Sequence, residues 1–178
     1  MTRIIAGTWG GRRLTTPSGS GTRPTSDRVR EALFSSLRSE LGGFDGLRVL
    51  DLYAGSGALG LEAASRGAAH VDLVESAKGA AAAITRNIAD LGANATLHRL
   101  PAERFVTVDR SPYDLVFVDP PYADDPTAVL AALPRLLTVD ALVVVERSAR
   151  DDLTWPEGLS GIRDKSYGET RLYYGRTA

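Results

Sequence analysis

The sequence Arg48-Val-Leu-Asp-Leu-Tyr-Ala-Gly-Ser-Gly-Ala-Leu-Gly60 joins an apolar run to a glycine-rich turn and then to a helical pattern. The run Arg48–Leu52 has the length and apolar content of a buried strand, and a helix is predicted over residues 58–66. The glycines allow a sharp turn, and they let a ligand approach the backbone where the helix presents free N–H groups. This order of elements is typical of an α/β fold that binds a nucleoside.

The same alternation of apolar strands and helices continues along the chain. Strands are predicted at 48–52, 70–75, 95–100, 113–118 and 141–146, and helices at 58–66, 77–91, 103–108 and 127–137. Such alternation predicts a mostly parallel sheet with helices on both faces. Two further strands, at 162–166 and 170–174, flank Tyr167-Gly168-Glu169 and predict a closing antiparallel hairpin, which brings the sheet to seven strands.

The first 43 residues differ from the rest and are predicted to form an N-terminal extension, followed by the main domain over residues 44–178. A β-hairpin is predicted over 3–16, a linker over 18–22, and a helix that begins after a cap at Thr25 or Ser26. Residues 1–30 hold one acid, Asp27, against Arg3, Arg12, Arg13, Arg23, Arg28 and Arg30. Because the whole chain has a net charge of −1, the remainder is acidic, which favours a basic surface that meets phosphate.

Composition excludes several function classes. A chain of 178 residues that is 43% hydrophobic fits one globular unit with a substantial core. Without cysteine, the chain has no disulfide, thiolate metal site or Cys nucleophile, and with His70 and His98 as its only histidines no metal site is expected. The N-terminus lacks a signal-peptide pattern and no run has membrane-spanning length, so a soluble, cytoplasmic protein is expected, as a monomer.

The tetrapeptide Asp119-Pro120-Pro121-Tyr122 follows the predicted strand Tyr113–Val118 directly. The carboxylate of Asp119 and the carbonyl of Pro120 can both accept hydrogen bonds from one –NH2 group. The prolines fix φ and remove backbone donors, and Tyr122 offers a flat face for stacking. The pattern indicates a pocket for a planar ring with an exocyclic amine, although an ordinary strand end with a Pro-Pro turn is an equal alternative for the tetrapeptide alone.

The acids around the glycine turn favour one ligand over another. Glu75 ends the second strand, 20 residues after Gly55, where a carboxylate reaches ribose hydroxyls. Glycines at this spacing with a downstream acid also match a dinucleotide site, so an NAD-dependent oxidoreductase is a competitor. Asp51, however, would repel a pyrophosphate and suits a cationic ligand. S-adenosylmethionine (SAM), which has a ribose, an adenine, an ammonium and a sulfonium but no phosphate, fits better.

Five blocks in order resemble the class I SAM-dependent methyltransferases, and among them the bacterial RsmD-type 16S ribosomal RNA guanine-N2 methyltransferases. The blocks are Arg3-Ile-Ile-Ala-Gly7, Thr22-Arg-Pro-Thr-Ser-Asp-Arg-Val-Arg-Glu-Ala-Leu-Phe34, Asp51-Leu-Tyr-Ala-Gly-Ser-Gly-Ala-Leu-Gly-Leu-Glu-Ala63, Phe117-Val-Asp-Pro-Pro-Tyr122 and Tyr167-Gly-Glu-Thr-Arg-Leu172. The Arg-Pro-Thr block and its helix are the most specific to the family. The resemblance spans the whole chain and implies a Rossmann-like class I methyltransferase fold, SAM as cofactor, and methylation of a guanine N2 amine in 16S ribosomal RNA within a 30S subunit.

The resemblance also implies a set of cofactor-binding residues. Gly55, Ser56 and Gly57 would hold the methionine part, Asp51 its ammonium and Glu75 the ribose. The full set is Thr25, Arg28, Asp51, Tyr53, Ala54, Gly55, Ser56, Gly57, Leu59, Glu75, Ser76, Ala102, Glu103 and Asp119. One position departs from the family, which often has an acid before Ala102 where this chain has Pro101. The adenine amine would then have to be met by the Ala102 backbone or by Glu103.

For the substrate, the resemblance implies that Asp119 and Pro120 receive the guanine amine, with Pro121 shaping the pocket and Tyr122 stacking on the base. The RNA-binding residues expected in the extension are Arg3, Arg12, Arg13, Arg23 and Arg30. Two other methyltransferase classes share such a pocket. A DNA or RNA adenine-N6 methyltransferase is one, although DNA enzymes usually carry a recognition domain that this length cannot hold. A protein glutamine methyltransferase is the other, although it more often has Asn at position 119.

Overall fold

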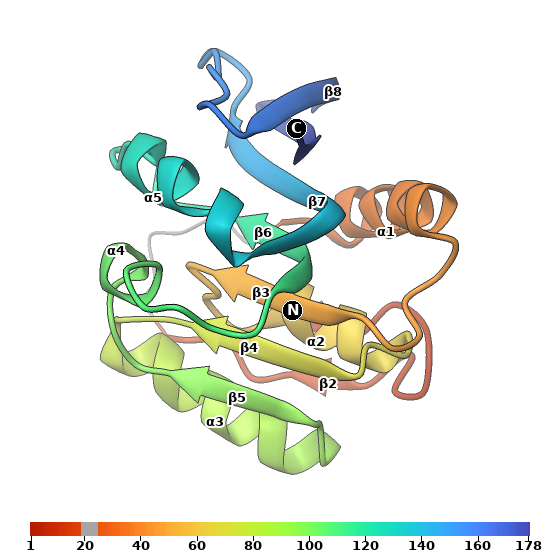
Figure 1. The fold of residues 1–178 in the computed structure, drawn as a ribbon. Helices are drawn as coiled ribbons and strands as arrows, with labels where there is room; N and C mark the ends of the chain where they lie inside the picture. The colour runs from red at the N-terminus through yellow and green to blue at the C-terminus, as the bar shows by residue number, and fades with distance from the viewer. Residues whose placement is uncertain (19–24) are drawn as a thin grey trace.

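The computed structural model describes residues 1–18 and 25–178, and their centre is one mixed sheet of seven strands (Figure 1). The strand order is β5-β4-β3-β6-β7-β9-β8. The parallel strands are β3 (Arg48–Leu52), β4 (His70–Val74), β5 (Ala95–His98), β6 (Tyr113–Val118) and β7 (Leu137–Ser148). Strands β8 (Leu159–Tyr167) and β9 (Thr170–Thr177) form the antiparallel hairpin. The predicted fold class is confirmed.

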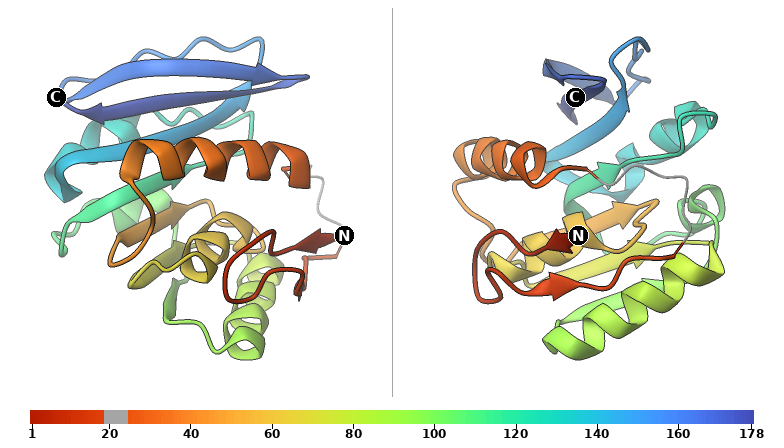
Figure 2. Two further views of the ribbon diagram at one scale, coloured as in Figure 1. Left: turned by 90° about the vertical axis from the view of Figure 1, so that its right-hand side faces the viewer. Right: turned by 180° about the vertical axis from the view of Figure 1, so that it is seen from behind.

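Helices cover both faces of the sheet (Figure 2). On one face lie α1 (Asp27–Leu41), α2 (Ala58–Ser65) and α3 (Lys78–Leu91), whose buried side chains share an apolar cluster with β3 and β4. On the other face, α4 (Ala102–Phe105), α5 (Thr127–Ala132) and the 3-10 helix η1 (Pro134–Leu136) pack over β6 and β7. The sheet is therefore buried on both sides, as its continuous apolar strands require.

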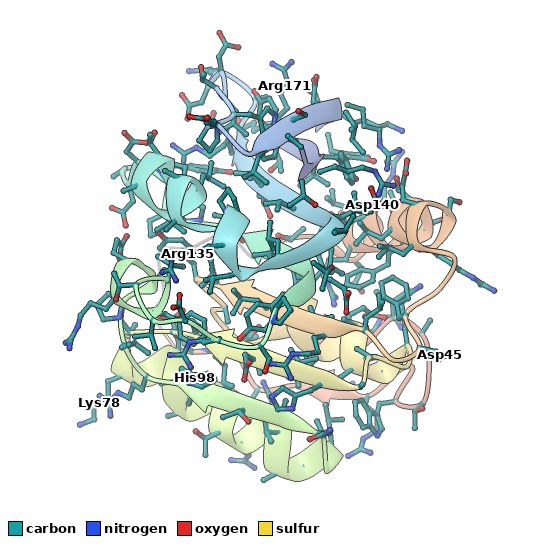
Figure 3. All side chains as sticks on the ribbon, viewed as in Figure 1. Asp45, Lys78, His98, Arg135, Asp140 and Arg171 are labelled. Carbon is teal, nitrogen blue, oxygen red and sulfur yellow. The ribbon has the colours of Figure 1, made fainter. Side chains whose placement is uncertain are left out.

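Several helices and strands are shorter or longer than the sequence predicts. The helix expected over 127–137 ends at Ala132, because the ring of Pro134 removes a backbone donor and a 3-10 turn follows. β7 begins at Leu137 rather than at residue 141, and the chain passes through Asp140 at φ 62° before the buried part of the strand. Asp140, labelled in Figure 3, is exposed, and its carbonyl oxygen accepts from Arg176, which also donates to Glu40 of α1. Its left-handed backbone accompanies a shift in the β6–β7 register.

The N-terminal hairpin is confirmed, although its strands are only two residues long: β1 is Thr2–Arg3 and β2 is Arg13–Leu14. Ser26 caps α1 by accepting from the N–H of Val29 at 3.2 Å. The predicted linker over 18–22 falls largely, and Arg23 entirely, outside the described residues.

The hairpin is fastened to α2 by a buried carboxylate. Glu62 has no exposed surface and accepts from the backbone N–H groups of Ile5 at 2.7 Å and Ala6 at 3.0 Å. Ile4 is also fully buried, in the cluster that α2 shares. The hairpin therefore packs as part of the core.

Helix α1 packs on the sheet in the same way as α2 and α3. Leu33, Phe34 and Leu37 are fully buried, and the ring of Phe34 lies 5.7 Å from that of Phe117 in β6. The division of the chain between residues 43 and 44 stays a prediction. Among the described helices, none combines the length and apolar content needed to span a bilayer.

Candidate active site

The carboxyl ends of four adjacent strands bring the predicted site residues to one edge of the sheet. Leu52 of β3 pairs with Val74 of β4 and with Val118 of β6, and Val118 pairs with Val145 of β7. The residues that follow these positions are Tyr53, Glu75, Asp119 and Glu146. In an open parallel sheet, ligands bind beyond the carboxyl ends of the strands. The arrowheads of β3 and β4 point to this edge at the left of Figure 1.

The glycine loop leaves β3 through three residues with left-handed backbone, Tyr53 (φ 60°), Gly55 (φ 61°) and Gly57 (φ 84°). A Cβ on Gly55 would meet no described atom within 4 Å, so the loop backbone is open at this point. Gly57 packs tightly, and its added Cβ would lie 3.2 Å from the side chain of Leu61. The loop therefore has one open glycine and one packed glycine, which fits a ligand lying along its backbone.

Glu75 holds the glycine loop from the neighbouring strand. Its Oε1 accepts from the N–H of Gly55 at 2.8 Å, and its Oε2 accepts from the N–H of Ala77 at 2.9 Å. A carboxylate offers about four acceptor positions, so two remain for the hydroxyls of a ribose. Ser76, the next residue, is exposed beside it. This arrangement fits the predicted role of Glu75.

Asp51 lies beneath the loop and is 1% exposed. Its Oδ2 accepts from the N–H of Gly60 at 2.9 Å, which leaves Oδ1 to meet a ligand. Burial, with a smaller contribution from the negative charge of Glu75, raises the pKa of Asp51 to about 8, although the hydrogen bond from Gly60 opposes the rise. A cationic group above Asp51 would favour its charged form.

At the proposed adenine end, the structure brings Tyr53 and Glu103 together. The Tyr53 hydroxyl donates to Oε1 of Glu103 at 2.9 Å, and burial followed by this contact raises the pKa of Tyr53. Ala102 is buried at the start of α4, directly after Pro101. Glu103 therefore lies beside the glycine loop. It is one of the two residues expected to replace the acid that the family often has before Ala102.

The Asp119-Pro120-Pro121-Tyr122 segment begins where β6 ends. The N–H of Asp119 lies 3.5 Å from the carbonyl oxygen of Leu52, so the segment starts beside the glycine loop. Pro120 is buried and Pro121 is exposed. The side chain of Tyr122 is 52% exposed, which leaves a ring face open for stacking.

Asp119 neighbours a second carboxyl group, that of Glu146, because the two acids follow the paired residues Val118 and Val145 on adjacent strands. Burial first, and then the negative charges of Glu146 and Asp51, raise the pKa of Asp119 well above its ordinary value. Burial also raises the pKa of Glu146, while its contacts with Thr25 and Asp119 oppose the rise. Both buried carboxyl groups therefore hold a proton more tightly than an exposed acid does.

Two N-terminal residues assigned to the cofactor lie in different settings. Thr25 Oγ1 donates to Oε2 of Glu146 at 2.9 Å, which places the extension against the carboxyl pair. Arg28 is exposed on the first turn of α1. Of the remaining predicted cofactor residues, Ala54 is half-buried in the loop and Leu59 is buried on α2.

Besides Glu146, two further residues at the site were not among the site residues predicted from the sequence. Arg147 is 8% exposed, and its NH2 group donates to the carbonyl oxygen of Tyr122 at 3.2 Å. Asn87 of α3 is 1% exposed and makes two hydrogen bonds to the backbone of Thr15 in the extension. Its Oδ1 accepts from the N–H of Thr15 at 2.7 Å, and its Nδ2 donates to the carbonyl oxygen of Thr15 at 2.9 Å. The same amide donates to the carbonyl of Ser56 in the glycine loop at 2.9 Å.

The basic residues of the extension divide into exposed and buried groups. Arg3, Arg12 and Arg13 are exposed on the hairpin. Arg30 has no exposed surface, and it donates to the Arg3 carbonyl and to Asp27, both at 2.7 Å. This corrects the expectation for Arg30, because a buried guanidinium does not reach RNA.

The chain was compared with known proteins. The family model described as conserved hypothetical protein 95 matches residues 2–176. Ribosomal RNA small subunit methyltransferase D of Escherichia coli is 40% identical over 96% of this chain and 88% of its own length. The solved structure of yhhF from Escherichia coli is 37% identical, covers 98% of this chain and 97% of its own, and has a TM-score of 0.85. A hypothetical protein of Thermus thermophilus is 34% identical, with 98% of each chain covered and a TM-score of 0.82.

Proposed function

The chain belongs to the conserved hypothetical protein 95 family, together with ribosomal RNA small subunit methyltransferase D, and we propose that it methylates the exocyclic N2 amine of one guanine in 16S ribosomal RNA. It is a SAM-dependent methyltransferase with the fold of the class I enzymes. The small ribosomal subunit RNA is its substrate, and an assembled or assembling 30S subunit is the form that we propose it acts on.

One observation supports the proposal above all others: the glycine loop and the Asp119-Pro120-Pro121-Tyr122 segment leave neighbouring parallel strands at the same level. Asp51 pairs with Phe117 and Leu52 with Val118, so Tyr53 and Asp119 are the next residues on both strands. A cofactor along the loop and a base in the pocket would therefore meet at this edge. Holding two reactants in this way supplies effective molarities of up to about 10⁵–10⁸ M.

The residues of the loop fit SAM. The open backbone at Gly55 would follow its methionine part, Glu75 would take the ribose hydroxyls, and Oδ1 of Asp51 would face the ammonium. Tyr53 and Glu103 would border the adenine. When bound, SAM supplies a sulfonium methyl group to the nucleophile that faces it.

The carboxyl pair is suited to prepare the amine and to take its proton. The lone pair of the guanine N2 is delocalised into the ring, and acceptors on both of its hydrogens, Asp119 and the Pro120 carbonyl, would localise it. The amine becomes strongly acidic once it carries a methyl group. Because burial raises the pKa of both Asp119 and Glu146, a carboxylate oxygen of this pair can accept the released proton. Removing the target base from its stack in the RNA costs a few kcal/mol, and stacking of the base on Tyr122 would offset part of that cost.

The N-terminal extension is proposed to contact the RNA. Arg3, Arg12 and Arg13 lie exposed on the hairpin and would meet phosphates. Arg23 lies outside the described residues. We propose that the target is recognised by the shape of a folded RNA.

The proposal is tested by incubating the protein and labelled SAM with 30S subunits that lack the modification, with naked 16S RNA and with DNA. The labelled nucleoside is then mapped by mass spectrometry. N2-methylguanosine at one position of the RNA is expected. Label that enters only DNA, an adenine or a protein glutamine would overturn the proposal in favour of another amino-methyltransferase.

The role of the extension needs point substitutions, because a deletion would damage the core. Ile4 is fully buried, and Glu62 would lose the two backbone donors of the hairpin. Replacing Arg12 and Arg13 by glutamine should weaken RNA binding and lower its dependence on salt concentration, while SAM affinity stays unchanged. Unchanged RNA affinity in this double variant would contradict the proposed contact.

A further inference from the structure

The carboxyl pair has a second acceptor that the amine does not need. Asp119 and the Pro120 carbonyl are enough to hold the two hydrogens of an –NH2 group. Glu146 nevertheless lies beside Asp119 and is only 8% exposed. The pairing of Val118 with Val145 places these acids one residue beyond paired positions on adjacent strands, so sheet geometry fixes their proximity.

Glu146 is also held in orientation from outside the sheet. Thr25 Oγ1 donates to its Oε2 at 2.9 Å, across 121 residues of sequence. This contact leaves acceptor capacity on the carboxylate. A buried acid that is fixed on one oxygen and lies beside Asp119 is a candidate for recognising the substrate base.

A buried donor, Arg147, contacts the end of the Asp119–Tyr122 segment. Arg147 uses its NH2 group for the Tyr122 carbonyl at 3.2 Å and for Asp151 at 3.6 Å. Its NH1 group is buried and has no hydrogen-bond partner among the described residues. Because an unpaired buried donor is costly, this NH1 group is available to donate to an acceptor that arrives with the substrate.

Together, Asp119, Glu146 and Arg147 present two acceptors and one donor. The edge of guanine presents the complementary groups in sequence, the N2 amine, the N1–H and the O6 oxygen. Adenine and cytosine have a lone pair, not a hydrogen, on the ring nitrogen next to their exocyclic amine. A second carboxylate beside Asp119 therefore favours guanine and disfavours the other two amines.

We propose that Glu146 accepts from N1–H and that Arg147 donates to O6 of the target guanine, so that these two residues select the base whose amine Asp119 holds. The inference rests on the proposed function. It adds two specificity-determining residues, at positions that the Asp119–Tyr122 segment does not include.

The test uses base analogues at the target position, after the wild-type protein has been used to map it. 2,6-Diaminopurine keeps the N2 amine but has a lone pair at N1 and an amine in place of O6. Inosine keeps N1–H and O6 but lacks the N2 amine. Small subunits are reconstituted with guanine or either analogue, and both methylation and competitive binding are measured.

The wild-type protein should methylate guanine about 10- to 100-fold faster than diaminopurine at limiting subunit concentration, as expected for a buried hydrogen bond to a charged group. Inosine subunits should compete for binding nearly as well as guanine subunits, and diaminopurine subunits poorly. Glu146→Gln should bring the ratio of the guanine and diaminopurine methylation rates close to one, because an amide can donate to the N1 lone pair of diaminopurine. Arg147→Met should weaken binding of inosine subunits by about 10-fold.

The controls separate this inference from the proposed function. Glu157→Gln makes the same chemical change at an exposed residue and should leave the preference intact. SAM titration by calorimetry reports whether each variant retains a folded cofactor site. A wild-type protein that methylates no RNA amine refutes the proposed function. Two outcomes refute the inference alone. In the first, the wild-type protein methylates guanine normally and diaminopurine equally well. In the second, the Glu146→Gln variant binds SAM and still prefers guanine to diaminopurine.

Discussion

Asp51→Asn is expected to stabilise the cofactor-free protein and to weaken its binding of SAM. Asp51 is buried beneath the glycine loop, and asparagine keeps the oxygen that accepts from the N–H of Gly60. Burial first and then the charge of Glu75 raise the pKa of Asp51 from 3.8 to about 8. At about 1.4 kcal/mol for each pKa unit, that difference corresponds to at most roughly 6 kcal/mol.

The direction in which stability changes with pH follows from the raised pKa of Asp51. The folded protein binds a proton at Asp51 more tightly than the unfolded chain does, so the contribution of this group to stability is fully present below about pH 4. It is lost progressively as the pH rises to about 8 and is constant above that value. The asparagine of the variant does not titrate. The advantage of the variant over the wild type should therefore grow between pH 4 and 8, to several kcal/mol.

Urea unfolding of both proteins without SAM, at intervals between pH 5 and 9, measures this difference directly. Asp152→Asn, which makes the same change at a fully exposed carboxylate, serves as the control and should show no such trend. In calorimetric titrations, Asp51→Asn should bind SAM about 10- to 100-fold more weakly, because the ammonium loses a charged partner. Stability curves of wild type and variant that run parallel over this pH range would refute the reasoning, as would equal SAM affinity.

Three further substitutions test other contacts of the site. Asn87→Ala removes its hydrogen bonds to both backbone groups of Thr15 and to the glycine loop, and should lower the free energy of unfolding by about 2–4 kcal/mol in urea; a loss below about 1 kcal/mol would show that water replaces the amide. Arg30→Met leaves Glu62 buried without its nearest cation on α1 and should cost about 3–5 kcal/mol in the same assay. A loss below about 1 kcal/mol would show that the neighbouring Arg66 is a sufficient partner for Glu62. Glu75→Gln should reduce SAM affinity by about 10- to 100-fold in calorimetry with little change for RNA, and equal losses for both ligands would argue for a general loss of structure.

The strands could be predicted from the sequence because their physical signals are local. Arg48–Leu52 and Tyr113–Val118 are short apolar runs closed by a glycine turn or a proline pair, and both were predicted with the bounds that the structure has. The bounds of α5 and β7 were not, because Pro134 and the left-handed Asp140 act through the local backbone conformation, which apolar periodicity does not report.

Two buried polar residues had a signal that was missed. Arg30 stands three, four and seven positions before Leu33, Phe34 and Leu37, so it continues the buried face of α1. Asn87 lies three positions after Ile84 on the buried face of α3. Helical spacing alone therefore places both in the interior, whereas their charge or polarity suggested the surface.

The contacts that complete the site had no such signal. Thr25 and Glu146 are 121 residues apart, and only the folded sheet brings them together. The unpaired NH1 of Arg147 depends on how the carbonyl of Tyr122 and the carboxylate of Asp151 occupy the rest of the guanidinium. Long-range geometry of this kind is set by packing and not by any single segment.

The three attachments of the extension bear on how this protein could change its target during evolution. Glu62 holds the hairpin, Asn87 holds Thr15, and Glu146 holds Thr25, so the extension is tied to two helices and one strand of the main domain. An exchange of the first 43 residues with those of another methyltransferase would break all three attachments at once. A new RNA target is therefore expected to arise through substitutions on the exposed side of the hairpin, with the anchoring positions retained, rather than through domain shuffling.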